Sequence, residues 1–496
     1  MKIQQFFEHH GIAGNPFADE DAQTDLVFKG ACIRTTYHPT WDKIYGEPSE
    51  PATAVVFGEK GSGKTALRLQ VAYHLTEYNA DHPDGQVFVV QYDDFNPFLD
   101  RFREKLSGRR RRADRALQRW RLWDHMDAML SLAVTQLVDR LLEVKQTRYP
   151  AARDEPLPID RLDPAQVRDV LLLAACYDQS TAENVIQRFK KLRRKLHFHN
   201  WFSRWDWVLG MVVTHAVIVW LITHDQLNLL FTVWPRLMIT ASWAPRFWYL
   251  FKYFWKARAI RRNTRVLNHT TNSIRRMLVK LRGSKLDGQP LPDRPRTDDR
   301  YELLGKLQGV LRSLGFDGIV VLIDRLDEPY LINGSTELMR ALLWPLLDNK
   351  LLRHPGLGLK LLLPIELERL IDREDRDFHQ RARLDKQNMV RSLQWTGQSL
   401  YDVANARVKA CAVEGSSPAL ADLFDGSVDE TRLMNSFGSL RVPRHLFKFM
   451  YRLLTVHCNA HSDEKPAWQI SGETFESVLA LYGRDQESLD RGESAG

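Results

Sequence analysis

The residues with the clearest chemical potential lie at positions 58 to 65, where the spacing G-x-x-x-x-G-K-T occurs. This segment reads Gly58, Glu59, Lys60, Gly61, Ser62, Gly63, Lys64, Thr65. Glycines let the backbone curl so that successive N–H groups, together with the following helix N-terminus, cradle phosphates. In this pattern Lys64 reaches the β- and γ-phosphates, and the hydroxyl of Thr65 binds Mg²⁺. The segment therefore predicts a nucleoside triphosphate site, since an ordinary Gly-rich turn would not explain the Lys-Thr pair.

A second chemical group follows the apolar run at 318–323 and reads Asp324-Arg325-Leu326-Asp327-Glu328. An apolar run that ends in an acid is typical of a central parallel strand, which delivers the acid to a phosphate site. We expect Asp324 to hold Mg²⁺, directly or through water. Asp327 and Glu328 are both candidates for polarising an attacking water, and the sequence leaves the choice open. A capped loop is the alternative, and the presence of the phosphate loop makes it the weaker one.

The elements that must position these groups are strands and helices in alternation. Residues 53–57 predict a buried strand, 64–78 a helix and 86–92 a second strand. Strand, loop, helix and strand form a βαβ unit, which implies a parallel sheet. Residues 318–323 and 358–364 predict two further strands. The expected fold class is α/β, a P-loop NTPase sheet with helices on both faces, interrupted by a helical and hydrophobic insertion and followed by a C-terminal helical lid.

Two further polar residues are candidates for sensing the nucleotide. Arg444 stands at the start of the helix expected at 445–456 and could reach the γ-phosphate from the lid. A solvent-facing residue at a helix N-terminus is an equally good interpretation. Glu366 follows the strand at 358–364, where a γ-phosphate sensor often lies, and it is equally well interpreted as an acid at a helix N-terminus.

The insertion contains two apolar segments. Residues 208–223 carry no formal charge, and residues 227–250 carry only Arg236 and Arg246. Crossing a bilayer takes about 20 residues. The first run reaches that length only if Trp205, Asp206 and Trp207 form its interfacial end, whereas the second run is long enough. Arg236 lies near the middle of the second run, and an arginine inside a membrane is costly, which counts against a simple span.

The flanks of this pair favour a membrane. Basic residues cluster at 188–195 and at 252–265, whereas the turn at 224–226 has no Lys or Arg. This is the positive-inside pattern of a hairpin with both ends in the cytoplasm, and six tryptophans lie near the expected interfaces. We expect a cytoplasmic protein attached to the inner membrane through residues 205–250, with anionic lipid as a partner. Shallow insertion, or a hairpin that is buried or faces a protein partner, are the alternatives.

The bulk composition is consistent with this interpretation. The 496 residues carry a formal net charge of +8, which suggests an anionic partner such as nucleotide, nucleic acid or lipid. The arginine run at 109–112 is a weak indication of nucleic acid, because few aromatic residues accompany it. The four cysteines are far apart, so neither a zinc site nor a disulfide framework is indicated. The N-terminus has no apolar core typical of a signal peptide.

The chain is too long for one hydrophobic core and is expected to form several parts. Taken in order, these are the N-terminal part of the P-loop domain (1–100), a basic helical insertion (101–200), the hairpin (201–256), a basic helix with a Pro-rich linker (257–298), the C-terminal part of the P-loop domain (299–400), the helical lid (401–484) and a disordered tail (485–496). A basic helix is expected to continue through 256–284.

The order of these parts resembles the KAP NTPases. Three features carry the resemblance: the Walker A loop at 58–65, an insertion with two apolar segments, and a Walker B element of the form hhhhD-x-h-D-E at 320–328. The Walker B element is also similar to that of STAND NTPases such as NACHT proteins. The segment 438–444, with its Pro443-Arg444 pair, is similar to the sensor-2 region of AAA+ relatives. KAP proteins usually carry Asp-Asp-Leu-Asp-Arg, whereas Arg325 and Glu328 stand here, so the resemblance does not choose the water-polarising residue.

The resemblance implies Mg²⁺-dependent hydrolysis of ATP, since no Asn-Lys-x-Asp guanine motif is present. It also implies a regulatory switch, of the kind found in bacterial signalling or phage defence, with a second copy of the chain or an effector protein as partner. Two alternatives remain. One is a soluble ATP-dependent switch whose hairpin binds a protein, and the other is a nucleic-acid-stimulated ATPase.

Overall fold

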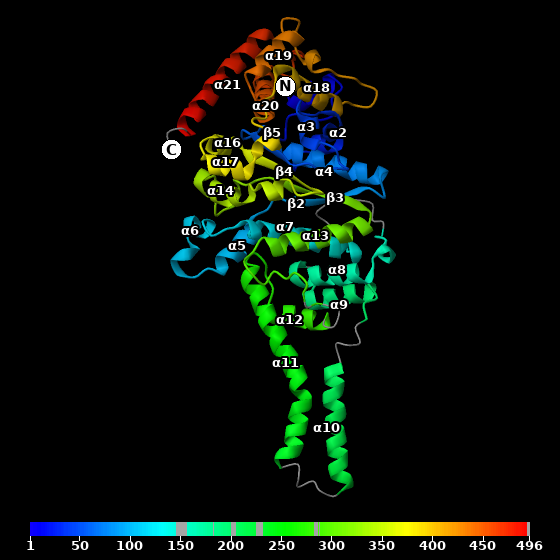
Figure 1. Ribbon diagram of the computed structural model, residues 1–496. Coiled ribbons are helices and arrows are strands. Elements are labelled where there is room, and N and C mark those ends of the chain that lie inside the picture. The colour runs from blue at the N-terminus through cyan, green and yellow to red at the C-terminus, as the bar shows by residue number, and fades with distance from the viewer. Residues whose placement is uncertain are drawn as a thin grey trace. The chain divides into compact units, whose positions relative to one another are not determined.

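The protein is α/β, with five parallel strands in one sheet in the order β2-β3-β4-β1-β5 (Figure 1). The computed structural model describes residues 1–144, 156–181, 183–199, 205–224, 232–281, 286 and 288–493. Its strands are β1 (Ala54–Gly58), β2 (Gln86–Tyr92), β3 (Phe316–Ile323), β4 (Leu357–Pro364) and β5 (Asn388–Val390). The first four lie close to their predicted bounds, and β5 was not predicted.

The chain divides into two compact units. The first contains Met1–Tyr78, Leu322–Asp327 and Leu352–Gly496, and the second contains Asn79–Val321 and Glu328–Leu351. The insertion expected at 101–298 therefore belongs to the second unit, and the candidate phosphate loop at 58–65 and Asp324 both belong to the first.

In the first unit, β1 is fully buried between β4 and β5. Val56 pairs in register with Leu362 on one side and Val390 on the other. These three side chains pack with Leu67 and Ile44. The helices that carry Leu67 and Ile44 are α4 (Lys64–Asp81) and α3 (Trp41–Tyr45). Burial of β-branched residues on this short strand fixes the direction in which β1 delivers the loop that follows it.

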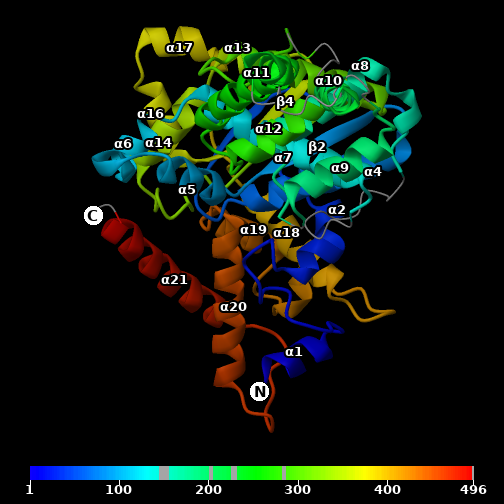
Figure 2. The ribbon, with the colours of Figure 1, turned by 90° about the horizontal axis from the view of Figure 1, so that it is seen from below.

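The C-terminal part of the first unit is helical and shares one apolar core with α1 (Ile3–His9). Helix α1 packs against α20 (Figure 2). The longer helices are α18 (Gly397–Ala410), α19 (Glu430–Gly438), α20 (Pro443–Ala460) and α21 (Gly472–Glu493). The unit also holds α2 (Ile33–Thr35), α16 (Ile365–Asp372) and α17 (Arg376–Ala382). A disordered tail was expected from position 485, but in the described residues α21 continues to Glu493. Asp485 pairs with Arg452 of α20 at 2.6 Å, which joins the start of that tail to the folded part.

The second unit contains β2, most of β3 and a set of helices. They are α5 (Asn96–Glu104), α6 (Ala113–Leu117), α7 (Leu122–Leu141), α8 (Pro164–Tyr177), α9 (Val185–Lys195), α10 (Trp205–Thr223), α11 (Val233–Asn263), α12 (Thr271–Lys280), α13 (Asp298–Ser313), α14 (Thr336–Leu343) and α15 (Asn349–Leu352). Helix α7 packs on β2, and α13 packs on α7 and α8. Gly315, at φ 94°, makes the turn from α13 into β3, a backbone conformation that favours glycine.

The two apolar segments form the long helices α10 and α11, which project from the second unit (Figure 1). Gly210 lies under the indole of Trp243, whose Nε1 donates to Thr214 Oγ1 at 3.1 Å. Asp206 and Arg246 face each other at 3.9 Å. The helices therefore pack on each other as a pair.

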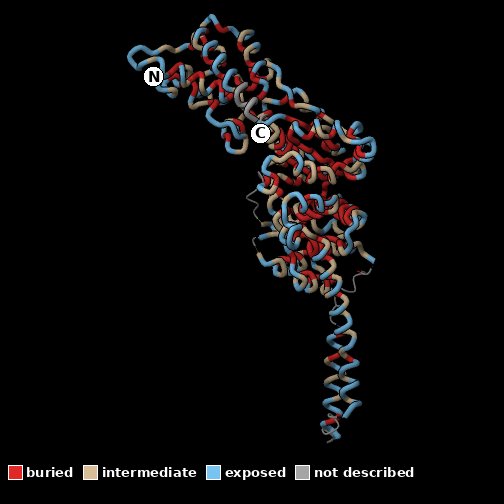
Figure 3. Tube along the Cα trace, turned by 90° about the vertical axis from the view of Figure 1, so that its left-hand side faces the viewer, coloured by how far each residue is buried: buried red, intermediate tan, exposed pale blue. Residues whose placement is uncertain are grey.

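Figure 3 shows that much of this pair is exposed, and many of its exposed side chains are large and apolar. Among the described residues, 17 of the 24 large exposed apolar side chains belong to α10 and α11. In the described part of the chain, α10 alone is both long and apolar enough to cross a bilayer, with 19 residues and a mean hydropathy of 1.7. A single helix of this kind is weak evidence for a membrane protein.

Helix α11 differs from its prediction in two ways. It begins at Val233, so Arg236 lies in its first turn and not near the middle of a span. It also continues without a break to Asn263, so the basic helix expected over 256–284 is in fact the end of α11 followed by the separate helix α12. Most of the predicted turn between the apolar segments lies outside the described residues.

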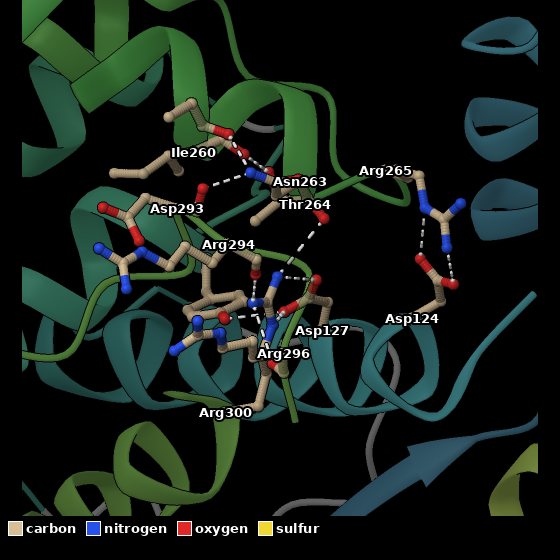
Figure 4. Close-up of polar contacts among 12 residues, drawn as sticks. Asp124, Asp127, Ile260, Asn263, Thr264, Arg265, Asp293, Arg294, Arg296 and Arg300 are labelled. Atoms are coloured by element: carbon tan, nitrogen blue, oxygen red, sulfur yellow. Dashed lines mark hydrogen bonds and ion pairs between the residues drawn. The ribbon is translucent and has the colours of Figure 1, made fainter. Parts of the chain in front are cut away.

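Buried polar contacts hold the end of α11 in the second unit (Figure 4). The Arg300 guanidinium donates to both carboxylate oxygens of Asp127 at 3.1 Å and to Asn263 O at 3.4 Å. Arg265 makes a two-pronged pair with Asp124. Lys105 Nζ donates to the backbone oxygens of Thr264 and Leu267. These contacts attach α11 to α5, α7 and α13 and give the hairpin a fixed base.

Candidate phosphate and magnesium site

The loop between β1 and α4 has the backbone geometry that the sequence predicted. Gly61 and Gly63 adopt φ of 88° and 92°, which side-chain-bearing residues rarely adopt. At Gly58, an added Cβ would lie 2.3 Å from Ser62 Oγ, so the close turn has no room for one. Helix α4 starts at Lys64, and its first N–H groups end the loop. This arrangement gives a glycine-dependent curl at the positive end of a helix, which suits an anion.

Lys64 lies folded over this loop. Its Nζ donates to Gly58 O at 2.8 Å and to Glu59 O at 2.9 Å. Burial lowers the pKa of Lys64, and the carboxylates of Asp324, Asp327 and Glu366 oppose this shift. The ammonium group of Lys64 therefore lies at the loop, where the negative charge of these three carboxylates favours its protonated form.

Asp324 is brought to the loop from 259 residues away in sequence. Its Oδ2 accepts a hydrogen bond of 2.9 Å from Thr65 Oγ1. The buried Arg68 lies on α4, and its Nε approaches the same Oδ2 at 3.3 Å. Burial raises the pKa of Asp324, while Arg68 and Thr65 lower it. A carboxylate is thus held against the threonine hydroxyl and balanced by a buried cation.

The oxygens of Thr65 and Asp324 are suitable ligands for Mg²⁺. They are hard donors, and Mg²⁺ bound beside a phosphate commonly takes one or two protein oxygens and keeps several waters. No group of three or more His, Cys, Asp or Glu side chains that could hold a metal occurs in the described ranges. The fit to Mg²⁺ therefore depends on phosphate oxygens and water completing the coordination.

Two residues from the C-terminal part of the first unit contact the outer side of the loop. Trp395 Nε1 donates to Ser62 O at 2.9 Å. The backbone N–H of Arg444 donates to Gly61 O at 3.4 Å, and its Cβ would clash with any Cβ at position 61. The Arg444 guanidinium lies 3.9 Å from Glu20, which Lys448 also approaches at 3.6 Å. The backbone of Arg444 therefore lies beside Gly61, and its role at a γ-phosphate stays a prediction.

The two candidates for polarising water lie in different surroundings. Arg325 adopts φ of 60°, a left-handed conformation that turns the chain sharply after Asp324. Asp327 follows in the first unit, is half-buried and acts on the pKa of Lys64. Glu328 is exposed and begins the next segment of the second unit. Within the first unit, Asp327 is thus the candidate that the structure brings together with Lys64.

Sequence reasoning missed Arg68 and Trp395. Arg68 stands three residues after Thr65, and side chains three apart share a helix face, so this spacing was a usable signal. Trp395 lies more than 300 residues from Ser62, and nothing in the local sequence indicates their hydrogen bond.

No protein-family model, no curated protein and no solved structure matches this chain in the comparisons. The assignment of its chemistry therefore depends on the residues and geometry of the site itself.

Proposed function

We propose that the protein is a Mg²⁺-dependent ATP-hydrolysing switch, attached to a membrane by α10 and α11. One observation carries this proposal: the hydrogen bond between Thr65 and Asp324 at the mouth of a glycine-dependent loop. Two segments far apart in sequence supply the two kinds of oxygen that such a reaction needs beside a phosphate. The resemblance of the motifs to KAP and STAND NTPases points to the same reaction and to a regulatory role.

In this proposal the loop and the start of α4 bind the phosphates through backbone N–H groups. Lys64 would leave the carbonyls of Gly58 and Glu59 and place its charge on the β- and γ-phosphates. Mg²⁺ held at Thr65 and Asp324 would neutralise charge on the same phosphate oxygens. Arg444 would add a further positive charge from the outer side of the loop.

A carboxylate must orient the water that attacks the γ-phosphate. Asp327 is favoured, because it lies within electrostatic reach of Lys64 in the same unit. Glu328 remains the second candidate. The variants Asp327→Asn and Glu328→Gln, which each remove one carboxylate, distinguish the two candidates. The variant that loses the orienting carboxylate should bind ATP as tightly as wild type while its turnover falls by two or more orders of magnitude.

ATP binding can be measured separately from hydrolysis, and it tests the site first. Titration calorimetry with ATP and Mg²⁺ should give a binding isotherm for wild type and none for Lys64→Ala. Phosphate release by the Asp327→Asn and Glu328→Gln variants then assigns the base. If both variants hydrolyse ATP at the wild-type rate, neither residue has the proposed role.

Membrane attachment is proposed from the exposed apolar faces of α10 and α11. A helix rises about 1.5 Å per residue, so the 19 residues of α10 measure about 28 Å, close to the thickness of a hydrocarbon core. Arg236 stands in the first turn of α11, where its side chain could extend to the far interface. Nucleotide state at the phosphate loop would then be reported to, or read from, the membrane.

Washing membranes with alkaline carbonate separates this proposal from the soluble alternative. The protein should remain with the membrane after the wash. Release into the supernatant, as for a peripheral protein, would favour a hairpin that binds a protein partner.

A further inference from the structure

One face of the second unit is built from three helical segments that are rich in basic residues. Helix α9, helix α12 and the end of α11 carry fourteen Lys or Arg and no Asp or Glu. They are Arg188, Lys190, Lys191, Arg193, Arg194, Lys195, Lys252, Lys256, Arg258, Arg261, Arg262, Arg275, Arg276 and Lys280. The whole chain has 70 basic and 62 acidic residues, so chain composition does not explain this separation. We call this set the basic collar.

The collar is one surface in space. Helix α12 packs against both α11 and α9. Figure 1 shows α9 and α12 at the end of the second unit from which α10 and α11 project. Sequence positions nearly one hundred apart therefore meet around the base of the hairpin.

Part of the collar's charge is internally balanced, and part is available to a ligand. Arg188 is buried and pairs with Asp178 and Asp139, while Lys191 and Lys195 pair with Glu183 and Glu143. Six exposed members make no ion pair with any residue of the described ranges: Lys190, Arg194, Arg258, Arg261, Arg262 and Arg276. An anion at this surface would not have to displace an existing carboxylate.

The order of side chains along α11 indicates where the collar would lie relative to a bilayer. From Val233, a hydrocarbon core of about 30 Å covers about 20 residues of helix and ends near Lys252. Around this point stand the exposed Trp248 and Trp255, 66% and 52% exposed. Arg258 and Arg262 follow within three turns. An apolar stretch, then aromatic rings, then cations is the sequence of environments from hydrocarbon through interface to headgroups.

We propose that the basic collar binds the headgroups of anionic phospholipids, so that the hairpin of α10 and α11 prefers an anionic leaflet. This inference rests on the membrane part of the proposed function, and it adds the surface and the residues that would select anionic lipid. Nucleic acid is the other polyanion to consider, but a polynucleotide would not account for the apolar helices that the collar surrounds.

Flotation of the full chain with vesicles tests the inference. Wild type is mixed with vesicles of pure phosphatidylcholine, or of phosphatidylcholine with 30% phosphatidylglycerol, at low salt. The test variant combines Arg194→Gln, Arg258→Gln, Arg262→Gln and Arg276→Gln, which are exposed positions. The matched control combines Arg109→Gln, Arg110→Gln, Arg111→Gln and Arg112→Gln, which removes the same charge from exposed arginines outside the collar.

Each neutralised arginine should weaken partitioning into the anionic vesicles by about fivefold, so the four substitutions of the collar variant should together weaken it by about two to three orders of magnitude. The control should stay within a few-fold of wild type, and all three proteins should partition alike into pure phosphatidylcholine. High salt should reduce the difference between wild type and the collar variant.

Three results would overturn the inference. The first is equal loss in the collar and control variants, which would mean that only net charge matters. The second is a collar variant that keeps wild-type preference for phosphatidylglycerol. The third is binding of a labelled 30-nucleotide DNA or RNA that depends on the collar while the preference for anionic vesicles does not. Wild type that floats with neither vesicle would overturn the membrane part of the proposed function as well, whereas equal flotation with both would leave that part standing.

Discussion

Replacing Asp127 by alanine should destabilise the second unit strongly, because Asp127 holds a buried cation at the base of the hairpin. The Asp127 and Arg300 side chains are both fully buried, and Arg300 Nε and Nη2 lie 3.1 Å from the two carboxylate oxygens. Tyr177 OH also donates to Asp127 Oδ1 at 2.8 Å. Asp127→Ala would leave the Arg300 guanidinium with only backbone carbonyls as acceptors in an interior from which water is excluded (Figure 4).

Breaking a buried pair by removing one partner costs about 3–5 kcal/mol. Each 1.4 kcal/mol is about a tenfold change in an equilibrium constant, so the opening equilibrium of this region should rise by about two to four orders of magnitude. Amide hydrogen exchange followed by mass spectrometry measures this locally, in peptides from α7 and α13. A local measurement is needed because a chain of two units need not unfold in a single transition.

The matched control is Asp84→Ala, which breaks an ion pair of the same length in the same unit. Asp84 and Arg161 are also 3.1 Å apart, but their side chains are 80% and 57% exposed. Exposed pairs contribute about 0–1 kcal/mol, so exchange should change little. The double variant Asp127→Leu with Arg300→Met should recover much of the loss, since replacing both charges removes the unpaired cation. Exchange in Asp127→Ala as slow as in the Asp84 control would refute the reasoning.

Three further outcomes are expected. Trp395→Phe removes the hydrogen bond to Ser62 O, so ATP binding measured by calorimetry should weaken by about fivefold, the equivalent of about 1 kcal/mol, while the fold is kept. Unchanged affinity would mean that this contact does not shape the loop. Arg68→Met leaves the Asp324 carboxylate buried without its cation, so the melting temperature should fall. Added Mg²⁺ with ATP should then raise the melting temperature of this variant more than that of wild type, and equal rises in both proteins would contradict this. Burial lowers the pKa of Lys360 to about 8 from 10.5, so the unfolded chain holds this proton more tightly. In thermal unfolding, wild type should therefore gain stability relative to Lys360→Met as pH rises from 8 to 10.5, and a constant difference across that interval would argue against a lowered pKa.

Local patterns predicted much of the fold and of the site. The buried strands β1, β3 and β4 are short apolar runs, and the loop at 58–65 has a spacing that specifies its own backbone. These features depend on neighbours in sequence, which is why they could be predicted. Asp324 was predicted because a buried parallel strand that ends in an acid carries that acid to the edge of the sheet where the phosphate loop also lies.

Other features depend on contacts that no local pattern records. Strand β5 has only three residues, and it forms by pairing with β1 at the edge of the sheet, a contact that its local sequence does not indicate. Helix α11 continues past its apolar part because Arg300, Lys105 and Asp124 bind its end and the residues after it. In sequence this region showed only a change from apolar to basic composition. The roles of Arg68 and Trp395 required the loop, α4 and the C-terminal helices to be placed together.

The most direct test of the central claim is phosphate release from ATP by the purified full chain, in the presence of Mg²⁺ and detergent, compared with Lys64→Ala prepared in the same way. The site predicts that wild type releases phosphate steadily and that Lys64→Ala releases no more than buffer does, because the lysine charge on the β- and γ-phosphates is lost. Hydrolysis by Lys64→Ala at the wild-type rate would contradict the account.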